Sequence, residues 1–332
     1  MTKTTFLILR LAVLLVAPAI LCGQDLPASK IDLTKQQWFG YALCYSGYRE
    51  GQNPDTGTYP SQAQILEDFL ILQKHWTLIR TYGSDQHSRD VLEAIRRDSI
   101  RLKVMLGAWL SAEPGNEKGN ASQIAECIRL ANEYKDIVVA VSVGNEALVS
   151  WSNHKVPVQK VIQYVDQVKA AVQVPVTVDD DFLFWTTHGA ELGKHVDFIA
   201  THMYPVWGKH DIDSGLAVTV KLYDMVKASL PGKTIVIGEA GWATYTVGEQ
   251  HAPRAGDEVK QKRYFGELSD WGKKNNVTVF FFEAFDEPWK GEGTEGHWGL
   301  FSVGRKAKLA MQQWYPELKT DKPTSPQYED KR

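Results

Sequence analysis

The amino-acid sequence predicts a single-domain α/β protein with the (β/α)8 TIM-barrel architecture. Eight short apolar runs recur between residues 38 and 285, and patterns typical of one-sided helices separate them. Runs that are apolar without alternation indicate parallel strands buried on both faces, and amphipathic helices between them would cover the sheet. Eight such units within residues 37–316 match a closed barrel better than an open doubly wound sheet, since no GxGxxG motif follows the first run.

The predicted strands follow one another along the chain. They cover residues 38–46, 76–83, 102–109, 137–146, 174–180, 196–204, 234–242 and 277–285. Apolar residues spaced by three and four form helical stripes between them, at Ile124, Cys127, Ile128 and Ala131 and at Val158, Val161, Ile162, Val165 and Val168. No stretch rich in Pro, Gly or Ser divides the pattern, so residues 37–316 are expected to form one catalytic domain.

Both ends of the chain are predicted to lie outside the barrel. Residues 1–22 combine a basic start with an apolar run, the pattern of a signal peptide that is too short to span a membrane. The APA sequence at 17–19 fits signal cleavage, whereas Cys22 suits a lipoprotein, although Leu21 is too large for a good lipobox. We therefore predict export to the medium, periplasm or cell surface, with membrane contact only if Cys22 is lipidated. The polar tail at 317–332 is expected to be disordered.

Composition narrows the choice of partners. Hydrophobic residues make up 43% of the 332 residues and charged residues 23%, with a net charge of −3, as in ordinary soluble globular proteins. The 37 Lys and Arg residues are balanced by 40 Asp and Glu residues without a basic run, which argues against nucleic acid as a partner. The nine histidines show no metal-ligand spacing and there is no CxxC motif, so we expect neither a metal nor a cofactor. Cys44 and Cys127 are either buried free thiols or a disulfide, and we expect a monomer.

The ends of the predicted strands carry most of the residues that can do chemistry. In a TIM barrel the active site lies at the C-terminal ends of the strands. Carboxylates recur there without a cofactor motif, which points to cleavage of glycosidic bonds. A retaining mechanism needs one protonated carboxylic acid and one ionised carboxylate about 5 Å apart. Glu146 and Glu239 end the fourth and seventh strands, on opposite sides of the barrel mouth, and the neighbouring Asn145 could hold a sugar 2-hydroxyl.

These residues also allow structural readings. A carboxylate such as Glu239 could form a buried ion pair with an arginine or lysine. The triple aspartate at 179–181 could hold an ion, although at most two of its side chains point into the barrel, and we favour sugar binding or barrel-mouth structure. His202 is expected to be a hydrogen-bonded barrel residue. Flat aromatic residues near the strand ends are candidates for stacking on sugars: Trp207, Trp242, Trp289 and Trp298.

Six short blocks, taken together and in order, resemble glycoside hydrolase family 17, the β-1,3-glucanase family. They are RTYG (80–83), VGNEAL (143–148), MYP (203–205), IGEAGW (237–242), FEAFDEPWK (282–290) and EGHWGLF (295–301). The resemblance covers about residues 38–302, and the form of the fifth block is closer to fungal and bacterial members than to plant members.

The resemblance implies a role for individual residues. Glu146 would be the proton donor and Glu239 the nucleophile. Two groups of residues would bind substrate. One is the cluster of Glu287, Lys290 and Glu295, and the other consists of the subsite residues Tyr45, Tyr82, Asn145 and Tyr204. Trp242, a stacking candidate, is also expected to bind substrate. We expect Lys290 to keep the nucleophile ionised and burial to raise the pKa of the acid.

The expected function is that of an exported retaining hydrolase of a β-1,3-glucan such as laminarin, without a cofactor. A β-1,3-glucanosyltransferase needs the same two glutamates and differs only in its acceptor subsites, so it remains the alternative. A glucan-binding barrel without activity is less favoured, because both glutamates are present with their flanking residues.

Overall fold

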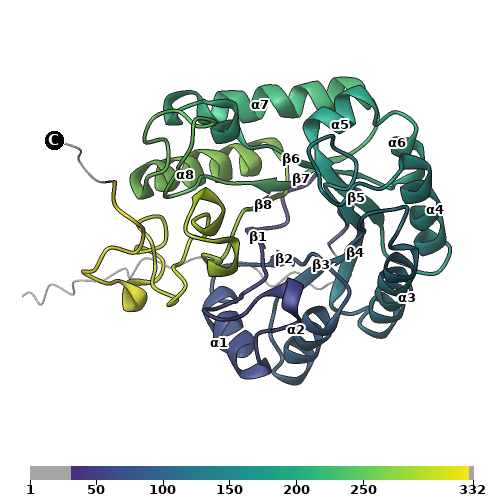
Figure 1. Cartoon of the computed structure of the whole chain (residues 1–332), viewed down its shortest axis with the longest axis horizontal. Coiled ribbons are helices and arrows are strands. Elements are labelled where there is room, and N and C mark those ends of the chain that lie inside the picture. Colours follow the sequence, from purple (N-terminus) through teal and green to yellow (C-terminus); the bar gives the residue numbers. More distant parts are fainter. Residues whose placement is uncertain (1–30, 329–332) are drawn as a thin grey trace, which may run out of the picture.

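Eight parallel strands form a closed barrel in the computed structural model, which describes residues 31–328. They pair in the order of the sequence, and β8 pairs with β1 to close the barrel (Figure 1). The strands are β1 (Ala42–Cys44), β2 (Leu78–Arg80), β3 (Lys103–Ala108), β4 (Val138–Asn145), β5 (Val176–Asp181), β6 (Ile199–His202), β7 (Ile235–Ala240) and β8 (Val279–Phe281). Seven lie within the predicted runs and β5 extends one residue beyond its run, to Asp181, so the predicted barrel is confirmed.

Helices form an outer ring around these strands (Figure 1). They are α1 (Gln62–Leu72), α2 (Gln86–Arg97), α3 (Glu117–Glu133), α4 (Val158–Lys169), α5 (Phe182–Thr187), α6 (Leu192–His195), α7 (Ile212–Ser229) and α8 (Glu258–Asn275). The predicted apolar stripes face the barrel, since Val161, Val165 and Val168 of α4 are buried. No helix among residues 31–328 has the length and apolar character needed to cross a bilayer.

The last unit departs from the predicted pattern, because no long helix follows β8 within the described residues. Residues 282–318 instead form loops and three short 3-10 helices, η4 (Pro288–Lys290), η5 (Thr294–Gly296) and η6 (Pro316–Leu318). Five glycines fall between positions 291 and 304, and glycine disfavours helix because it has more backbone freedom to lose. The chain is therefore free to fold back over the barrel mouth.

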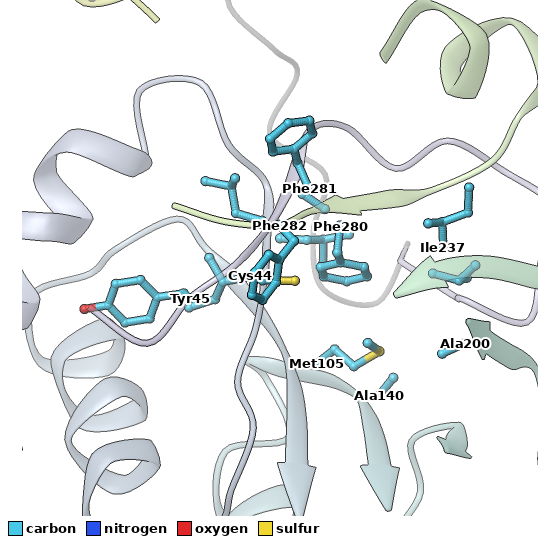
Figure 2. Close-up of a cluster of buried hydrophobic side chains, with 14 of the residues drawn as sticks. Cys44, Tyr45, Met105, Ala140, Ala200, Ile237, Phe280, Phe281 and Phe282 are labelled. Carbon is cyan, nitrogen blue, oxygen red and sulfur yellow. The ribbon is translucent and has the colours of Figure 1, made fainter. Parts of the chain in front are cut away.

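Buried side chains from several strands fill the barrel interior. Figure 2 shows Met105, Ala140, Ala200, Ile237 and Phe280 lying together, and all five are fully buried. Small alanines on β4 and β6 leave room for the larger side chains of β3, β7 and β8, as expected for a packed barrel core. These side chains fill the barrel interior at this level, and the cleft that could hold a substrate lies above them, at the C-terminal ends of the strands.

The tail that was expected to be disordered, 317–332, is described as far as Tyr328, and this part lies against the barrel. The Ser325 hydroxyl donates to Glu258 at 2.9 Å, and the Thr246 backbone N–H donates to the Tyr328 hydroxyl at 3.0 Å. These contacts join the tail to the start of α8 and to the loop before it. The polar composition of the tail does not predict these contacts, because each is a hydrogen bond made by a single hydroxyl group.

Cys44 and Cys127 are buried free thiols, so the disulfide alternative is excluded in this structure. Burial raises the pKa of Cys127 to about 12, which keeps this thiol protonated and unreactive. The predicted signal peptide and Cys22 lie outside the described residues.

Candidate active site

The two predicted catalytic glutamates face each other across the barrel mouth. Glu239 lies in β7 and is 5% exposed, whereas Glu146 directly follows β4 and its side chain is 29% exposed. A carboxylate oxygen of each lies within 4.8 Å of one of the other. This separation matches the roughly 5 Å of retaining glycosidases rather than the roughly 6.5–9.5 Å that leaves room for a water in inverting enzymes.

The backbone of Glu146 is held in an unusual conformation. Its φ is +45°, in the left-handed region that non-glycine residues rarely adopt. The backbone N–H of Glu146 donates to the carbonyl of Asp179 in the adjacent strand at 2.9 Å. Strain of this kind occurs where surrounding contacts fix a functional side chain, and here it turns Glu146 out of the strand toward the cleft.

Both carboxylate oxygens of Glu239 accept a hydrogen bond. Arg80 Nη1 donates to one at 2.5 Å, and the Tyr204 hydroxyl donates to the other at 2.5 Å. The buried Arg80 also pairs with Asp179 at 2.8 Å and donates to Asn145 Oδ1. Burial lowers the pKa of Arg80, but Asp179 and Glu239 outweigh this and raise it well above its usual value. The ion pair considered as a structural reading is therefore present, and it fixes the position of the Glu239 carboxylate.

His202 joins the two glutamates. Its Nδ1 lies 2.8 Å from Glu146, and its Nε2 lies 3.4 Å from Asp179 and 3.6 Å from Glu239. Burial lowers the pKa of His202, but the charges of Glu239, Asp179 and Glu146 outweigh it and raise that pKa well above its usual value. The imidazole therefore carries a second proton and donates one to Glu146.

The expectation that burial raises the pKa of the acid is wrong for the free protein. Burial does act in that direction on Glu146, but the hydrogen bond and charge of His202, helped by Arg80, lower its pKa overall. The shared proton therefore rests on His202 rather than on Glu146. Sequence alone did not show this, because the two residues are 56 positions apart.

Lys290 lies in a second charged cluster. Its ammonium group contacts Glu287 at 2.5 Å and Glu283 at 3.7 Å, and Ser46 donates to the other oxygen of Glu287. Burial lowers the pKa of Lys290, but both carboxylates outweigh it and raise that pKa above its usual value. The cation that directly contacts Glu239, the predicted nucleophile, is thus Arg80, and Lys290 orders Glu287 beside the cleft.

A cleft of about 820 Å³ covers the barrel mouth. This volume lies near the upper end of the roughly 300–1,000 Å³ typical of small-molecule sites, which suits an oligosaccharide better than a single sugar. Most of the predicted site residues line it: Tyr82, Asn145, Glu146, Tyr204, Glu239, Glu287, Lys290 and Glu295. The stacking candidates Trp207, Trp289 and Trp298 line it as well.

Two predicted substrate-binding residues do not reach the cleft. Figure 2 shows the ring of Tyr45 directed away from the barrel interior, and its hydroxyl donates to Asp68 of α1 at 3.2 Å. Trp242 is fully buried, and its Nε1 donates to the carbonyl of Ala255 at 2.9 Å. Ser46, the neighbour of Tyr45, lines the cleft instead, because successive side chains of an extended chain point to opposite faces.

Several residues that line the cleft were absent from the predicted site. They are mainly aromatic or apolar and lie in the loops or first helical turns that follow the strands: Tyr48, His87, Trp109, Trp151, Phe182 and Leu183. Their position within a few residues of a strand end could have identified them as candidates for the cleft wall. The path of each loop decides whether such a side chain turns inward, and the sequence does not give that path.

Each of the three consecutive aspartates has a partner in the protein. Asp179 pairs with Arg80, Asp180 accepts the backbone N–H of Leu148 at 2.9 Å, and Asp181 accepts that of Leu183 at 2.8 Å. Their role in barrel-mouth structure, one of the two favoured readings, is thus confirmed.

Within the described residues, Glu146, His202 and Glu239 offer ligand atoms close enough together to hold a metal ion. A metal requires a neutral imidazole, whereas the carboxylates here keep His202 protonated. Arg80 already neutralises Glu239. The donor set therefore fits a metal poorly, and the absence of a cofactor remains a prediction.

Comparison with known proteins identifies a matching family and several relatives of this chain. The family model described as the BtgE/BtgC glycoside hydrolase domain matches residues 42–299. A probable glucan endo-1,3-beta-glucosidase btgC from Aspergillus clavatus is 28% identical over 285 residues, which cover 76% of this chain and 39% of that protein. A glucan 1,3-beta-glucosidase from Arthroderma benhamiae is 26% identical over 283 residues, covering 79% of this chain and 89% of that protein. The chain thus spans about two fifths of the Aspergillus relative.

Solved structures share the fold. An endo-laminarinase from Formosa Hel1_33_131 superimposes with a TM-score of 0.76 and 27% identity over 88% of this chain and 90% of that one. A glycoside hydrolase family 17 beta-1,3-glucanosyltransferase from Rhizomucor miehei superimposes with a TM-score of 0.70 and 22% identity, over 83% of this chain and 97% of that one.

Proposed function

Because the chain belongs to the BtgE/BtgC glycoside hydrolase domain family, we propose that it is an exported retaining hydrolase that cleaves β-1,3-glucosidic bonds of laminarin-type glucans. The observation that carries the proposal is the pair of carboxylates within 4.8 Å of each other, one of them held by a buried arginine. The names of the relatives, glucan endo-1,3-beta-glucosidase and endo-laminarinase, support this linkage and substrate. We assign the chain to glycoside hydrolase family 17 on the six sequence blocks.

The first step forms a covalent glycosyl-enzyme. A carboxylate oxygen of Glu239 attacks the anomeric carbon, and the bond from that carbon to the glycosidic oxygen breaks. The departing oxygen keeps the electron pair and takes a proton from Glu146. Arg80 and Tyr204 hold the attacking carboxylate in place, so little reorganisation is needed when the bond forms.

The second step returns the enzyme to its starting state. Glu146, now ionised, removes a proton from water while the water oxygen attacks the anomeric carbon. The ester bond to Glu239 breaks and the carboxylate is restored. Two inversions at one carbon retain its configuration.

His202 accounts for the supply of the proton. The charge of Glu239 helps to hold the second proton on His202. Ester formation removes that charge, so the imidazolium becomes more acidic at the moment when Glu146 delivers its proton. Through the hydrogen bond of 2.8 Å between them, His202 passes its proton to Glu146, which delivers it to the departing oxygen and is left ionised. In the second step the proton taken from water returns through Glu146 to His202.

Transfer to a second sugar remains the alternative, since it differs only in replacing water by a sugar hydroxyl. Trp151 favours it, because this residue lines the cleft on the Glu146 side and is 54% exposed. An exposed aromatic face at that position could hold an acceptor sugar.

The proposed export is based on the predicted signal peptide at residues 1–22, and the monomeric state is likewise a prediction.

Glu239→Gln tests the function. We expect at least about a thousandfold loss of kcat on laminarin, because the amide cannot act as the nucleophile. Binding of laminari-oligosaccharides, measured by calorimetry, should survive, because the amide has nearly the same size and still accepts a hydrogen bond from Arg80.

Glu113→Gln is the matched control. Glu113 is about as buried as Glu239, at 6% exposed, but its contacts are with Asn120 and Tyr164 outside the cleft. This variant should keep its turnover. Substantial activity of Glu239→Gln would show that Glu239 is not the nucleophile, and failure of the wild-type protein to cleave any β-1,3-glucan would overturn the proposed substrate.

A further inference from the structure

The turn that carries Glu146 follows an irregularity in the sheet. Between Ser142 and Asn145 the pairing of β4 with β5 shifts register, because β4 advances three residues there while β5 advances two. The extra residue makes a β-bulge, and Gly144 adopts a φ of +94° within it. Bulges at barrel rims redirect the side chains that follow them, and the strained Glu146 comes two residues after this glycine.

Backbone pairing with β5 ends soon after this bulge. The N–H of Glu146 donates to the carbonyl of Asp179 at 2.9 Å. In a regular parallel ladder the next donor, Leu148, would meet the carbonyl of Asp181. The chain turns away at that point, because Asp181 is the N-cap of α5. The side chain of Asp180 supplies an acceptor instead, and its Oδ2 accepts the N–H of Leu148 at 2.9 Å.

Asp180 is fully buried and does not line the cleft, so it can act on the reaction only through other residues. Its second oxygen accepts the N–H of Asp181 at 2.9 Å. Burial outweighs the charge of His202 and raises the pKa of Asp180 to about 8. At neutral pH the carboxyl group therefore holds Leu148 as a hydrogen-bond acceptor and not as a charge. Leu148 is itself buried, so its N–H depends on this acceptor.

We propose that Asp180 is a positioning residue for the catalytic acid. Its hydrogen bond to Leu148 fixes the far side of the turn, while the bond from Glu146 to Asp179 fixes the near side. Together they keep Glu146 in its left-handed conformation, with its carboxyl group directed at the departing oxygen. His202 holds the side chain of Glu146, whereas Asp180 holds its backbone. This inference rests on the proposed function, and Asp180 lies outside the six sequence blocks.

The test depends on the leaving group of the substrate. A sugar needs a proton from the acid in order to leave, whereas dinitrophenolate departs without one. The variant Asp180→Leu has a side chain of similar size but no acceptor. We expect its kcat/KM for laminaritetraose to fall about ten- to a hundredfold, because a displaced acid protonates the sugar oxygen poorly. The value for dinitrophenyl β-laminaribioside should change less than about threefold, because its leaving group needs no acid.

Three further variants support this comparison. Asp180→Asn restores a neutral acceptor of the same shape and should recover most of the loss. Glu146→Ala, which lacks the acid itself, should show the same selective loss to a greater degree. Asp197→Asn is the matched control, because Asp197 accepts the backbone N–H of Val176 at 2.8 Å at the opposite end of β5. This control should leave both kcat/KM values unchanged.

The ratio of the two kcat/KM values does not depend on how much of a variant is folded, so lower stability of Asp180→Leu does not obscure the result. If that variant cannot be purified, Asp180→Ala also lacks the acceptor and should give the same ratio. Equal losses on both substrates, or full activity on laminaritetraose, would overturn the positioning role while Glu146→Ala still shows the selective loss. Failure of the wild-type protein to cleave either substrate would instead overturn the proposed function.

Discussion

His202 hydrogen bonds to Glu146 and lies within 3.6 Å of the carboxylates of Asp179 and Glu239. Three anions around one buried imidazole keep it protonated, and Arg80 is the other cation that faces this group. His202 was expected to be a hydrogen-bonded barrel residue, and this expectation is confirmed. Its effect on the acid was missed, because it depends on the distance between two strand ends rather than on either strand.

The variant His202→Gln should move the basic limb of the pH profile to lower pH. In the wild-type protein this limb reflects loss of the proton shared with Glu146, held by the raised pKa of His202. Without the imidazolium the proton must rest on Glu146, a carboxyl group that releases it at lower pH even when burial raises its pKa. A shift of one pH unit lowers kcat/KM on the alkaline side about tenfold.

The measurement is kcat/KM on laminarin from acidic to alkaline pH, with His75→Gln as a control outside the cleft. At acidic pH the His202→Gln variant should retain most of its activity. An unchanged basic limb would show that His202 does not hold the catalytic proton. A uniform loss at every pH would indicate that it only maintains the structure.

At the scale of single residues, the sequence predicted the location of those side chains whose place depends only on where a strand ends. Glu146 and Glu239 could be found because a carboxylate at the end of an apolar strand has a known place in a barrel. Tyr45 and Trp242 were misplaced because one step along an extended chain reverses the direction of a side chain. Trp151 was missed because its loop follows no regular pattern, and His87 was missed because it lies in the first turn of α2, several residues beyond the strand end.

At the scale of elements, the strap formed by residues 324–328 supports one wall of the cleft. Thr324 and Ser325 hydrogen bond to Glu258, and Tyr328 binds the backbone of the loop between β7 and α8. In the same loop, His251 packs on Trp207 with 4.3 Å between ring centroids. Trp207 lines the cleft, so the strap connects the end of the described chain to the substrate site.

Deletion of residues 324–332 should destabilise the protein by about 1–3 kcal/mol. Several hydrogen bonds of about 0.5–1.5 kcal/mol each are lost, partly offset by the freedom that the strap regains. Chemical denaturation measures this change in the free energy of unfolding. KM for laminarin should also rise a fewfold, because the loop that supports Trp207 is less constrained.

A shorter deletion, of residues 329–332, is the control, since it keeps every hydrogen bond of the strap. It should leave both stability and KM unchanged. Wild-type stability in the longer deletion would show that the strap contributes nothing to the fold.

The elements themselves illustrate the limit of sequence patterns: periodicity predicted all eight strands, but the strap is held by three isolated hydroxyl groups that no periodicity reveals.

At the scale of the whole molecule, the cleft has two unlike sides. The side formed after β1, β2 and β8 carries polar and charged groups, among them Glu287, Lys290 and His87. The side formed after β4 and β5 carries Trp151 and Leu183, which are 54% and 43% exposed. A sugar on the first side is held by specific hydrogen bonds, whereas one on the second side meets an apolar surface that binds it loosely. Loose binding there suits rapid departure of the leaving chain and exchange with an acceptor.

The variant Trp151→Ala should therefore lower transfer without lowering hydrolysis. Transfer requires a sugar on the apolar side after the first chain has left, and stacking on Trp151 stabilises it there by about 0.5–1.5 kcal/mol. The ratio of products longer than the starting laminaritetraose to shorter ones should fall about two- to tenfold at high substrate concentration, as measured by mass spectrometry over time. Leu70→Ala, which removes an equally exposed residue outside the cleft, should leave the ratio unchanged. If the wild-type protein forms only shorter products at every concentration, Trp151 does not serve an acceptor, and the protein is a hydrolase alone.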